Sequence, residues 1–316
     1  MKPIVVVGSI NMDLVSQTER IPRPGETVAG LNFQLHSGGK GANQAVAVAR
    51  LGYPSILLGV TGNDIFGRQL LSTLKDFGVD TRHVETTAGS SGTASIVVDS
   101  KGENTIIVTP GSNQNVTPAY LRTKVDVLSK AGMILAQLEV PIDTIAWLAD
   151  FCSNSGIPLM LDPAPATELP PTLLSQVAWF TPNQTEAAFY AAPGEATEEM
   201  LLRFFGLGIK NVILKRGSDG AIVAGADGSS ERIEIFPVEA LDTTAAGDAF
   251  NGAFSVALMR GQSPTESARF AAAAAAISVT RIGAQSSLPG QDEVVAFLVA
   301  HSRSLSTSIL SQSSLL

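Results

Sequence analysis

The residues best suited to carry chemistry lie in the last third of the chain, in the segment Asp242-Thr243-Thr244-Ala245-Ala246-Gly247-Asp248. A threonine there can cap a helix whose first turn consists of small residues. The amides of that turn stay unpaired, and the helix dipole favours a negative charge beside them. A carboxylate at the same place, Asp248, suits phosphoryl transfer, in which a base takes the proton of a hydroxyl while amides absorb charge. An acidic first turn also occurs without any such role, but Gly247 directly before Asp248 favours the catalytic interpretation.

A second segment reads Ser37-Gly38-Gly39-Lys40-Gly41-Ala42-Asn43-Gln44 and directly precedes a helical pattern. Three glycines in four positions let the backbone approach a ligand closely. Amides at that helix start, together with Lys40 and Asn43, could hold hydroxyls or anionic oxygens. A glycine-rich turn packed beneath a helix has the same pattern, so this segment alone does not decide between the two.

Several common nucleotide and hydrolase motifs are absent from the sequence. The first apolar run is followed by Gly8-Ser9-Ile10-Asn11 and not by G-x-G-x-x-G, and Gly39-Lys40 lacks the remaining residues of a Walker A loop. Neither H-E-x-x-H nor G-x-S-x-G occurs. These absences weigh against a dinucleotide oxidoreductase, a P-loop enzyme, a zinc protease and a serine hydrolase.

Composition narrows the class of protein further. The 316 residues are 45% hydrophobic and 16% charged, which is enough apolar surface for a large core and excludes overall disorder. A net charge of −8 argues against a nucleic-acid partner, because phosphate neutralisation needs the opposite sign. The single cysteine, Cys152, excludes an internal disulfide. The start of the chain reads as a buried strand and not as a signal peptide, and no apolar run reaches 18 residues, so we expect a soluble, cytoplasmic protein without a membrane span.

The elements that must position the two segments follow from alternating patterns. Short apolar runs predict buried strands at residues 4–7, 55–60, 133–136, 158–161, 178–180 and 212–214. Helical patterns lie between them, most clearly at 64–77 and 246–260. Strands that alternate with helices predict an α/β fold with a doubly wound, mostly parallel sheet and helices on both faces.

Two regions and the end of the chain depart from this alternation. Residues 14–36 and 93–110 have only strand patterns and could form a small second sheet, either a lid over a site or a surface ornament. We expect residues 1–301 to form the main domain. The Ser-rich tail, 302–316, is expected to be disordered, as a mobile extension or a frayed continuation of a helix near 294–300.

With both segments in order, the chain from about residue 7 to 288 resembles the PfkB-type (ribokinase) family of carbohydrate kinases. The resemblance implies ATP-dependent phosphorylation of the 5-hydroxyl of D-ribose, with Asp248 as the base and the amides of Ala245, Ala246, Gly247 and Asp248 as the anion hole. The alternative acceptors within the family are fructose, 2-keto-3-deoxygluconate and nucleosides. A non-catalytic sugar-binding protein on the same fold would be expected to lose the base, whereas Asp248 is present.

Further roles are implied only by this resemblance. The sugar would be bound by Asn11, Asp13, Gly39, Lys40, Asn43, Glu139 and Asp248, with Asn11 and Asp13 at the end of the first strand. ATP would be bound by Asn183, Lys215, Gly217, Ser218, Gly220 and Gly247. Magnesium would be held near Glu186 through water, although Asn183 and Glu186 also fit a helix capping box. Potassium would lie among Asp242, Thr244, Ser278, Arg281, Gly283 and Ser287, held largely by backbone oxygens.

The resemblance also implies a homodimer that pairs through the lid sheet. Two positions depart from the family pattern. Lys215-Arg216 stands where the family usually has Thr-Leu, and this basic pair could lie near the nucleotide phosphates or face solvent. Ala272 stands where the family often has a polar side chain near adenine.

Overall fold

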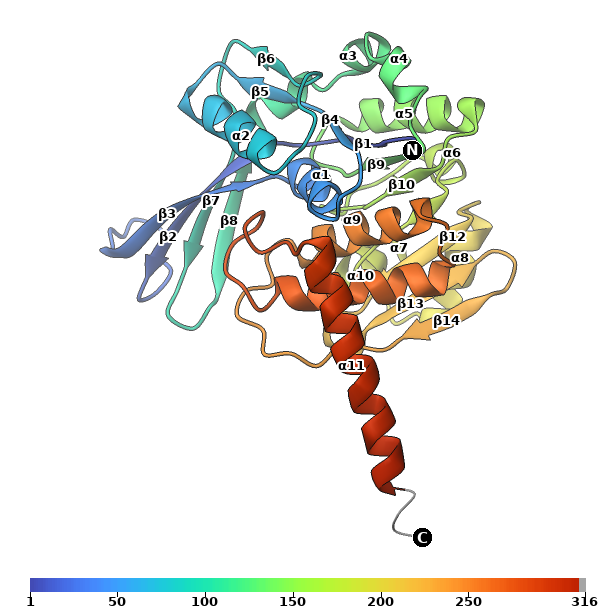
Figure 1. Ribbon diagram of the computed structural model, residues 1–316. Helices are drawn as coiled ribbons and strands as arrows, with labels where there is room; N and C mark the ends of the chain where they lie inside the picture. The colour runs from blue at the N-terminus through green and yellow to red at the C-terminus, as the bar shows by residue number, and fades with distance from the viewer. Residues whose placement is uncertain (313–316) are drawn as a thin grey trace.

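An eight-stranded sheet forms the centre of the molecule, which we describe from a computed structural model covering residues 1–312 (Figure 1). The strand order is β14-β13-β12-β11-β10-β9-β1-β4. All pairs from β4 to β12 are parallel, and β13 and β14 extend the sheet in antiparallel fashion. The strands are β1 (Ile4–Val7), β4 (Ser55–Leu58), β9 (Met133–Ala136), β10 (Leu159–Leu161), β11 (Trp179–Phe180), β12 (Asn211–Lys215), β13 (Ala221–Gly225) and β14 (Ser230–Ile233).

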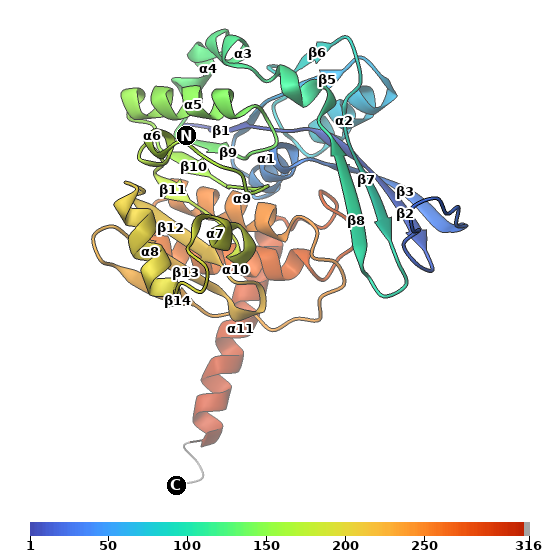
Figure 2. The ribbon, with the colours of Figure 1, turned by 180° about the vertical axis from the view of Figure 1, so that it is seen from behind.

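Helices cover both faces of this sheet, which confirms the predicted doubly wound, mostly parallel α/β fold (Figures 1 and 2). Because successive side chains of a strand point to opposite faces, Ile4 and Val6 enter one core while Val5 and Val7 enter the other. The helices are α1 (Lys40–Arg50), α2 (Ile65–Asp76), α3 (Pro118–Arg122), α4 (Val125–Leu128), α5 (Ile142–Ser155), α6 (Pro171–Leu174), α7 (Gln184–Tyr190), α8 (Thr197–Gly206), α9 (Ala246–Met259), α10 (Pro264–Ser278) and α11 (Gln291–Gln312). Short 3-10 turns lie at Gly111–Asn115 and Gly217–Asp219.

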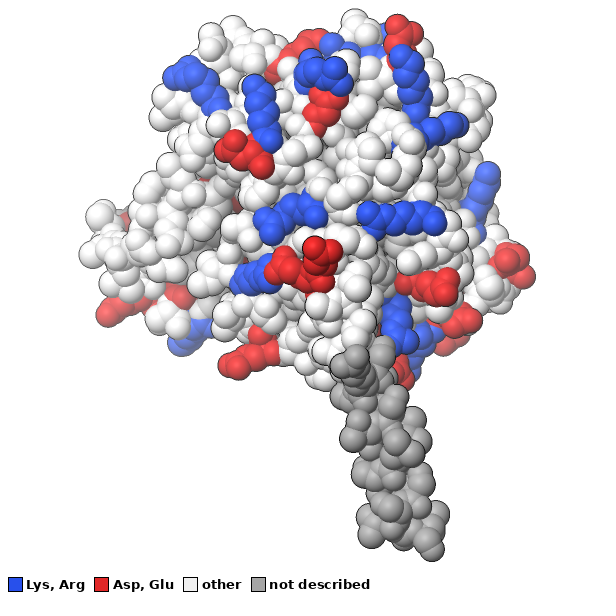
Figure 3. All heavy atoms as spheres, in the orientation of Figure 1, with Lys and Arg blue, Asp and Glu red and all other residues white. Residues whose placement is uncertain are grey.

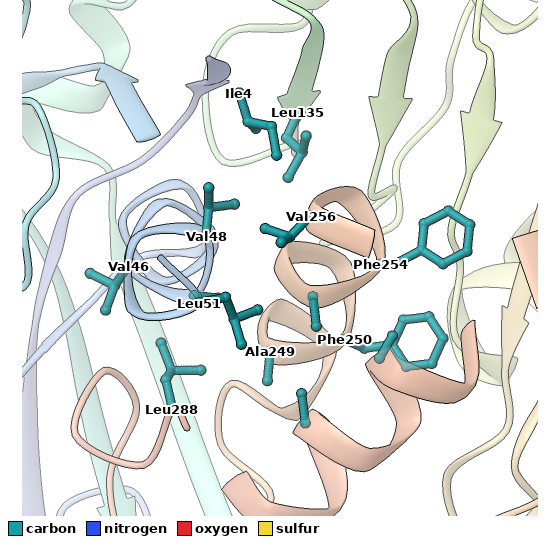
Figure 4. Packing of buried hydrophobic residues seen from close by; sticks show 14 of the residues in the cluster. Ile4, Val46, Val48, Leu51, Leu135, Ala249, Phe250, Phe254, Val256 and Leu288 are labelled. Carbon is teal, nitrogen blue, oxygen red and sulfur yellow. The ribbon is translucent and has the colours of Figure 1, made fainter. Parts of the chain in front are cut away.

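Helices α1 and α9 begin within the two segments singled out in the sequence, 37–44 and 242–248, and pack directly on each other. A Cβ at Gly252 of α9 would lie 2.4 Å from the Cβ of Ala47 on α1, so only glycine permits this approach. Figure 4 shows Val48 of α1 and Leu51, the residue directly after α1, beside Val256 and Ala249 of α9, under the sheet. The amino ends of both helices are therefore held at a fixed separation.

A separate four-stranded sheet, which we call the lid, projects from one side of the main body (Figures 1 and 2). Its order is β3-β2-β7-β8, formed by β2 (Asn11–Thr18), β3 (Gly30–Gly38), β7 (Gly92–Val98) and β8 (Asn104–Thr109). The second sheet expected from residues 14–36 and 93–110 is thus confirmed. Asn11 and Asp13 lie on β2 of the lid and not at the end of the first strand, because β2 begins only four residues after β1. A third, two-stranded sheet pairs β5 (Val60–Gly62) with β6 (Glu85–Thr87).

Helix α11 continues to Gln312, so the helix expected near 294–300 extends into the Ser-rich tail. The disorder predicted for 302–316 stays a prediction, and residues 313–316 lie outside the described part of the chain. Figure 3 shows acidic and basic side chains interspersed on the face that it presents. Within the described residues, no helix combines the length and the apolar character needed to cross a bilayer.

Candidate active site

The two predicted segments meet at the carboxylate of Asp248, in the first turn of α9. Asn43 Nδ2 donates to Asp248 Oδ2 over 3.0 Å, and Gln44 Nε2 donates to Oδ1 over 3.0 Å. Burial raises the pKa of Asp248 to about 6, and the charge of Asp162 adds to this, while Lys40 acts in the opposite direction. At neutral pH the group is therefore mainly a carboxylate whose affinity for a proton is higher than usual, as a general base requires.

The amides before Asp248 differ in detail from the sequence prediction. No threonine caps α9, because the capping position is occupied by Ala245, whose backbone has a left-handed conformation with φ of 60°. The Ala246 amide donates to the Thr243 carbonyl over 3.2 Å. Within the described residues, no acceptor takes the amides of Gly247 and Asp248. A strained non-glycine residue at a helix start with free amides is typical of a functional anion site.

Several residues predicted to bind the sugar converge on Glu139, which follows β9. Its carboxylate accepts from the Lys40 amide over 3.1 Å and from Asn11 Nδ2 over 3.4 Å, and it also contacts Ser9 Oγ. Asn113 Nδ2 fixes the Asn11 side chain at 2.6 Å. Asn113 was not predicted, because nothing in the pattern of residues 111–115 indicates a polar partner for Asn11.

Asp13 completes the sugar side from the lid. Burial, followed by the charges of Glu139 and Asp248, raises the pKa of Asp13 to about 7. Three carboxylates that influence one another, with side-chain amides around them, form a set of acceptors and donors suited to a polyhydroxylated ligand.

The glycines of the second segment serve backbone packing as well as ligand approach. Gly39 has φ of 89°, and a Cβ there would lie 2.7 Å from the Asn11 amide nitrogen. A Cβ at Gly41 would lie 2.6 Å from Gly8 Cα. The two interpretations left open by the sequence therefore hold together, because the same turn packs on the main chain and presents Lys40 and Asn43.

A cavity of about 690 Å³ opens on the other side of Asp248. It contains all six predicted ATP-binding residues: Asn183, Lys215, Gly217, Ser218, Gly220 and Gly247. Its apolar walls are Val238, Ala240, Ala272, Ala275, Ala276 and Val279. Ala272 thus lines the cavity as an apolar residue, and the size and walls suit a flat ring with a polar extension toward Asp248.

Comparison with known proteins assigns the chain to a family. Residues 1–291 match the description "pfkB family carbohydrate kinase". The chain belongs to this family. It is 40% identical over 296 residues to a ribokinase of Bacillus subtilis, covering 93% of this chain and 98% of that protein. A deoxyribokinase of Salmonella typhi is 34% identical over 301 residues, covering 93% and 98%.

Solved structures support the same assignment to the pfkB kinases. The structure of Arabidopsis thaliana ribokinase complexed with ribose and ATP superposes with a TM-score of 0.89 at 34% identity, covering 94% of this chain and 98% of that chain.

At the magnesium position expected for a pfkB kinase, Asn183 and Glu186 form the capping box that the sequence allowed. Asn183 Oδ1 accepts from the Glu186 amide over 2.8 Å, and the Asn183 amide donates to Glu186 Oε2 over 2.7 Å. Burial and the charge of Asp162 raise the pKa of Glu186. Both residues line the cavity, so capping does not remove them from the site.

The two side chains of the basic pair Lys215-Arg216 have different partners. Lys215 Nζ pairs with Asp162 Oδ1 at 2.9 Å inside the cavity, whereas Arg216 pairs with Asp219 at 3.7 Å. Asp162 was missed as a site residue, although its position directly after the buried strand β10 was a usable signal, since ligands bind at the carboxyl ends of parallel strands. Gln44 was also missed, and its amide nitrogen donates to both Asp162 and Asp248.

The residues predicted to hold potassium come from two parts of the chain, 242–244 and 278–287, which a hydrogen bond from Gly283 to Asp242 joins. Asp242 Oδ1 accepts from the Thr244 amide over 2.9 Å and Oδ2 from the Gly283 amide over 2.9 Å. The Arg281 amide donates to the Ser278 carbonyl, and its side chain contacts Glu293. Ser287 is buried in the same loop. No group of three or more His, Cys, Asp or Glu residues able to hold a metal occurs in the described part of this kinase.

Proposed function

We propose that this kinase is a ribokinase, transferring the γ-phosphoryl group of ATP to the 5-hydroxyl of D-ribose. The observation that carries the proposal is the position of Asp248, which is bonded to Asn43 on the sugar side and lines the nucleotide cavity on the other. A base between an acceptor site and free amides is the arrangement that phosphoryl transfer to a hydroxyl needs. The relationship to curated ribokinases supports ribose as the acceptor.

In this proposal each group has a defined task. Asn11, Asp13 and Glu139 hold sugar hydroxyls, and Asp248 accepts the proton of the 5-hydroxyl as its oxygen attacks. The free amides of Gly247 and Asp248 hold the phosphoryl oxygens on which charge develops. The lid, whose strand β2 contains Asn11 and Asp13, closes over ribose and excludes water that would compete as an acceptor.

Two metal ions belong to the proposal, and the residues present fit both. For magnesium, Glu186 supplies a buried carboxylate at the cavity, the kind of oxygen ligand that Mg²⁺ takes directly or through water. Bound magnesium would neutralise charge on the ATP phosphates. For potassium, burial opposes ionisation of Asp242, but hydrogen bonds from Thr244 and Gly283 together hold its pKa below the usual value. Asp242 therefore stays ionised where residues 242–244 and 278–287 meet, and backbone oxygens of these two parts would hold the ion.

A sugar panel tests the proposal. With MgATP, and with potassium present or absent, ADP release is measured for ribose, 2-deoxyribose, fructose, 2-keto-3-deoxygluconate and nucleosides. We expect the highest kcat/KM for ribose and a higher rate with potassium. A strong preference for fructose or a nucleoside would show that the acceptor is wrong while the kinase assignment holds. A rate independent of potassium would remove that ion from the proposal.

We further propose a homodimer that forms through the lid. The cross-strand row Leu35, Leu14, Ser95 and Ile107 lies on the lid face opposite to Asp13. On that face Phe33, Leu35 and Ile107 are 57%, 40% and 65% exposed. An apolar sheet face of this kind is typical of a protein contact surface.

Aspartate at both Phe33 and Leu35 is expected to convert the dimer to a monomer in sedimentation equilibrium. Burial of each apolar side chain contributes about 1.5–3 kcal/mol, and each subunit loses two of them. Leu202→Asp is the matched control, because Leu202 is 69% exposed on α8, outside the lid. A monomeric wild type, or a dimeric double variant, would contradict pairing through this face.

A further inference from the structure

Lys215 occupies a place in the cavity that the family pattern did not anticipate. It is the last residue of β12, and its side chain is only 12% exposed. Its Nζ lies 3.5 Å from the point where a Cβ on Gly247 would stand. The ammonium group therefore lies beside Gly247, in the first turn of α9.

Asp162 holds Lys215 in this position. Its Oδ1 accepts from Lys215 Nζ over 2.9 Å, and its Oδ2 accepts from Gln44 Nε2 over 3.1 Å. Gln44 is in turn fixed by Gln137, which donates to its Oε1 over 2.7 Å. An ammonium group has three donors, and this pair uses one of them. Two N–H donors of Lys215 remain for a ligand in the cavity.

The cavity is lined by more carboxylates than cations, so each cation matters for binding a negatively charged phosphate group there. The carboxylates of Asp162, Glu186 and Asp248 line the same space, and only Lys40 and Lys215 among the lining residues are cationic. Burial alone would lower the pKa of Lys40, but the charges of the surrounding carboxylates, first Asp248, raise it. The positive charge of Lys40 is thus offset mainly by Asp248, and then by the carboxylates around it. Lys215 forms an ion pair with Asp162 and also acts electrostatically on Glu186, and of the two cavity cations its Nζ lies nearer to Gly247.

We propose that Lys215 is a catalytic residue that donates to the non-bridging oxygens of the transferred phosphoryl group, with Asp162 as its positioning residue. This inference rests on the proposed kinase function. During transfer the bond from the γ-phosphorus to the bridging oxygen breaks, and the bond from phosphorus to the sugar oxygen forms. The hydroxyl proton passes to Asp248, ADP leaves with the bond electrons, and Lys215 keeps its protons. A fixed cation at the spreading negative charge stabilises the transition state.

A purely structural role would be to neutralise the buried Asp162. The two roles separate in three variants: Lys215→Met, the charge-balanced pair Lys215→Met with Asp162→Asn, and Arg216→Met as the matched control. Arg216 is the adjacent cation and pairs with Asp219. If Lys215 only balances Asp162, the charge-balanced pair recovers the wild-type rate. If Lys215 acts on the phosphoryl group, the pair stays impaired.

We expect Lys215→Met to lower kcat by about 10²–10³-fold, the usual cost of removing one donor at such a site. The charge-balanced pair should be equally slow, and Arg216→Met should match the wild type. Calorimetry should show that Lys215→Met weakens ATP binding more than AMP binding, because AMP lacks the terminal phosphates. Recovery of kcat in the pair, or equal losses for ATP and AMP, would overturn the inference.

The panel of acceptors keeps this test separate from the proposed function. Rates are compared on whichever acceptor the wild type phosphorylates best, so a wrong sugar leaves the Lys215 comparison intact. If the wild type phosphorylated none of them, the proposed function would fail. The contrast between ATP and AMP binding would then still decide whether Lys215 contacts the terminal phosphates.

Discussion

Asp248→Asn is expected to lower kcat by about 10²–10⁴-fold, the usual contribution of a positioned general base. The amide cannot accept the hydroxyl proton, while the cavity and the sugar-side residues remain. Asn43 and Gln44 both donate to this side chain, so the new NH₂ group must face one donor and one bond is lost. A coupled assay measures the rate, and calorimetry with ribose and ATP tests whether binding persists. Wild-type turnover in this variant would exclude the mechanism and favour a non-catalytic role for Asp248.

The pH profile of the wild type gives an independent check on the same base. In the sugar-free enzyme the pKa of Asp248 is raised to about 6, so the carboxylate is protonated, and kcat/KM is lost, as the pH falls through about 6. Asp13 has a pKa near 7 in the sugar-free enzyme and loses its negative charge at a higher pH. Because kcat/KM reports the free enzyme and kcat reports the complex, kcat/KM for ribose should begin to fall nearer pH 7. In Asp248→Asn the acid limb of kcat should be absent.

Asp13→Ala is expected to lower kcat/KM for ribose by about a hundredfold or more, with an unchanged KM for ATP. A carboxylate that accepts from two hydroxyls contributes roughly 1.5–3 kcal/mol per hydrogen bond. Asp13→Asn keeps the shape and one acceptor, so its loss should be intermediate. Steady-state kinetics with each substrate varied in turn measures both effects. An equal rise in the KM for ATP would indicate damage to the whole site and not the loss of a sugar ligand.

The main sheet was predictable because its strands are buried on both faces and read as short apolar runs. β13 was missed although Ala221–Gly225 is a short apolar run, whereas β14 could not be predicted, since Ser230-Glu231-Arg232-Ile233 has no apolar run and pairs with β13. Successive side chains of a strand point to opposite faces, so an uninterrupted apolar run predicts a hydrophobic core on each side of the sheet.

Within the site, the motif residues were predictable and their partners were not. Gly247 and Asp248 stand out by type and spacing, yet the cap of α9 is Ala245 with a left-handed backbone, a conformation that the propensity of alanine does not predict. Asp162, Asn113 and Gln44 act through partners that are distant in the chain, from 53 residues for Asp162 with Lys215 to 204 for Gln44 with Asp248. Such pairs form only when the sheet brings strand ends together.

Strand β2 connects the proposed sugar site with the orientation of the lid. Asn11 and Asp13 stand at its first positions, and its later residues pair with β3 and β7 in the middle of the lid. A change in lid orientation therefore moves Asn11 and Asp13, the residues proposed to bind the sugar, because they belong to the same continuous strand. By thermodynamic reciprocity, a contact on the lid that favours one orientation changes sugar affinity by the factor with which the sugar changes that contact. The sugar affinity of the proposed acceptor site thus depends on contacts made at the outer surface of the lid.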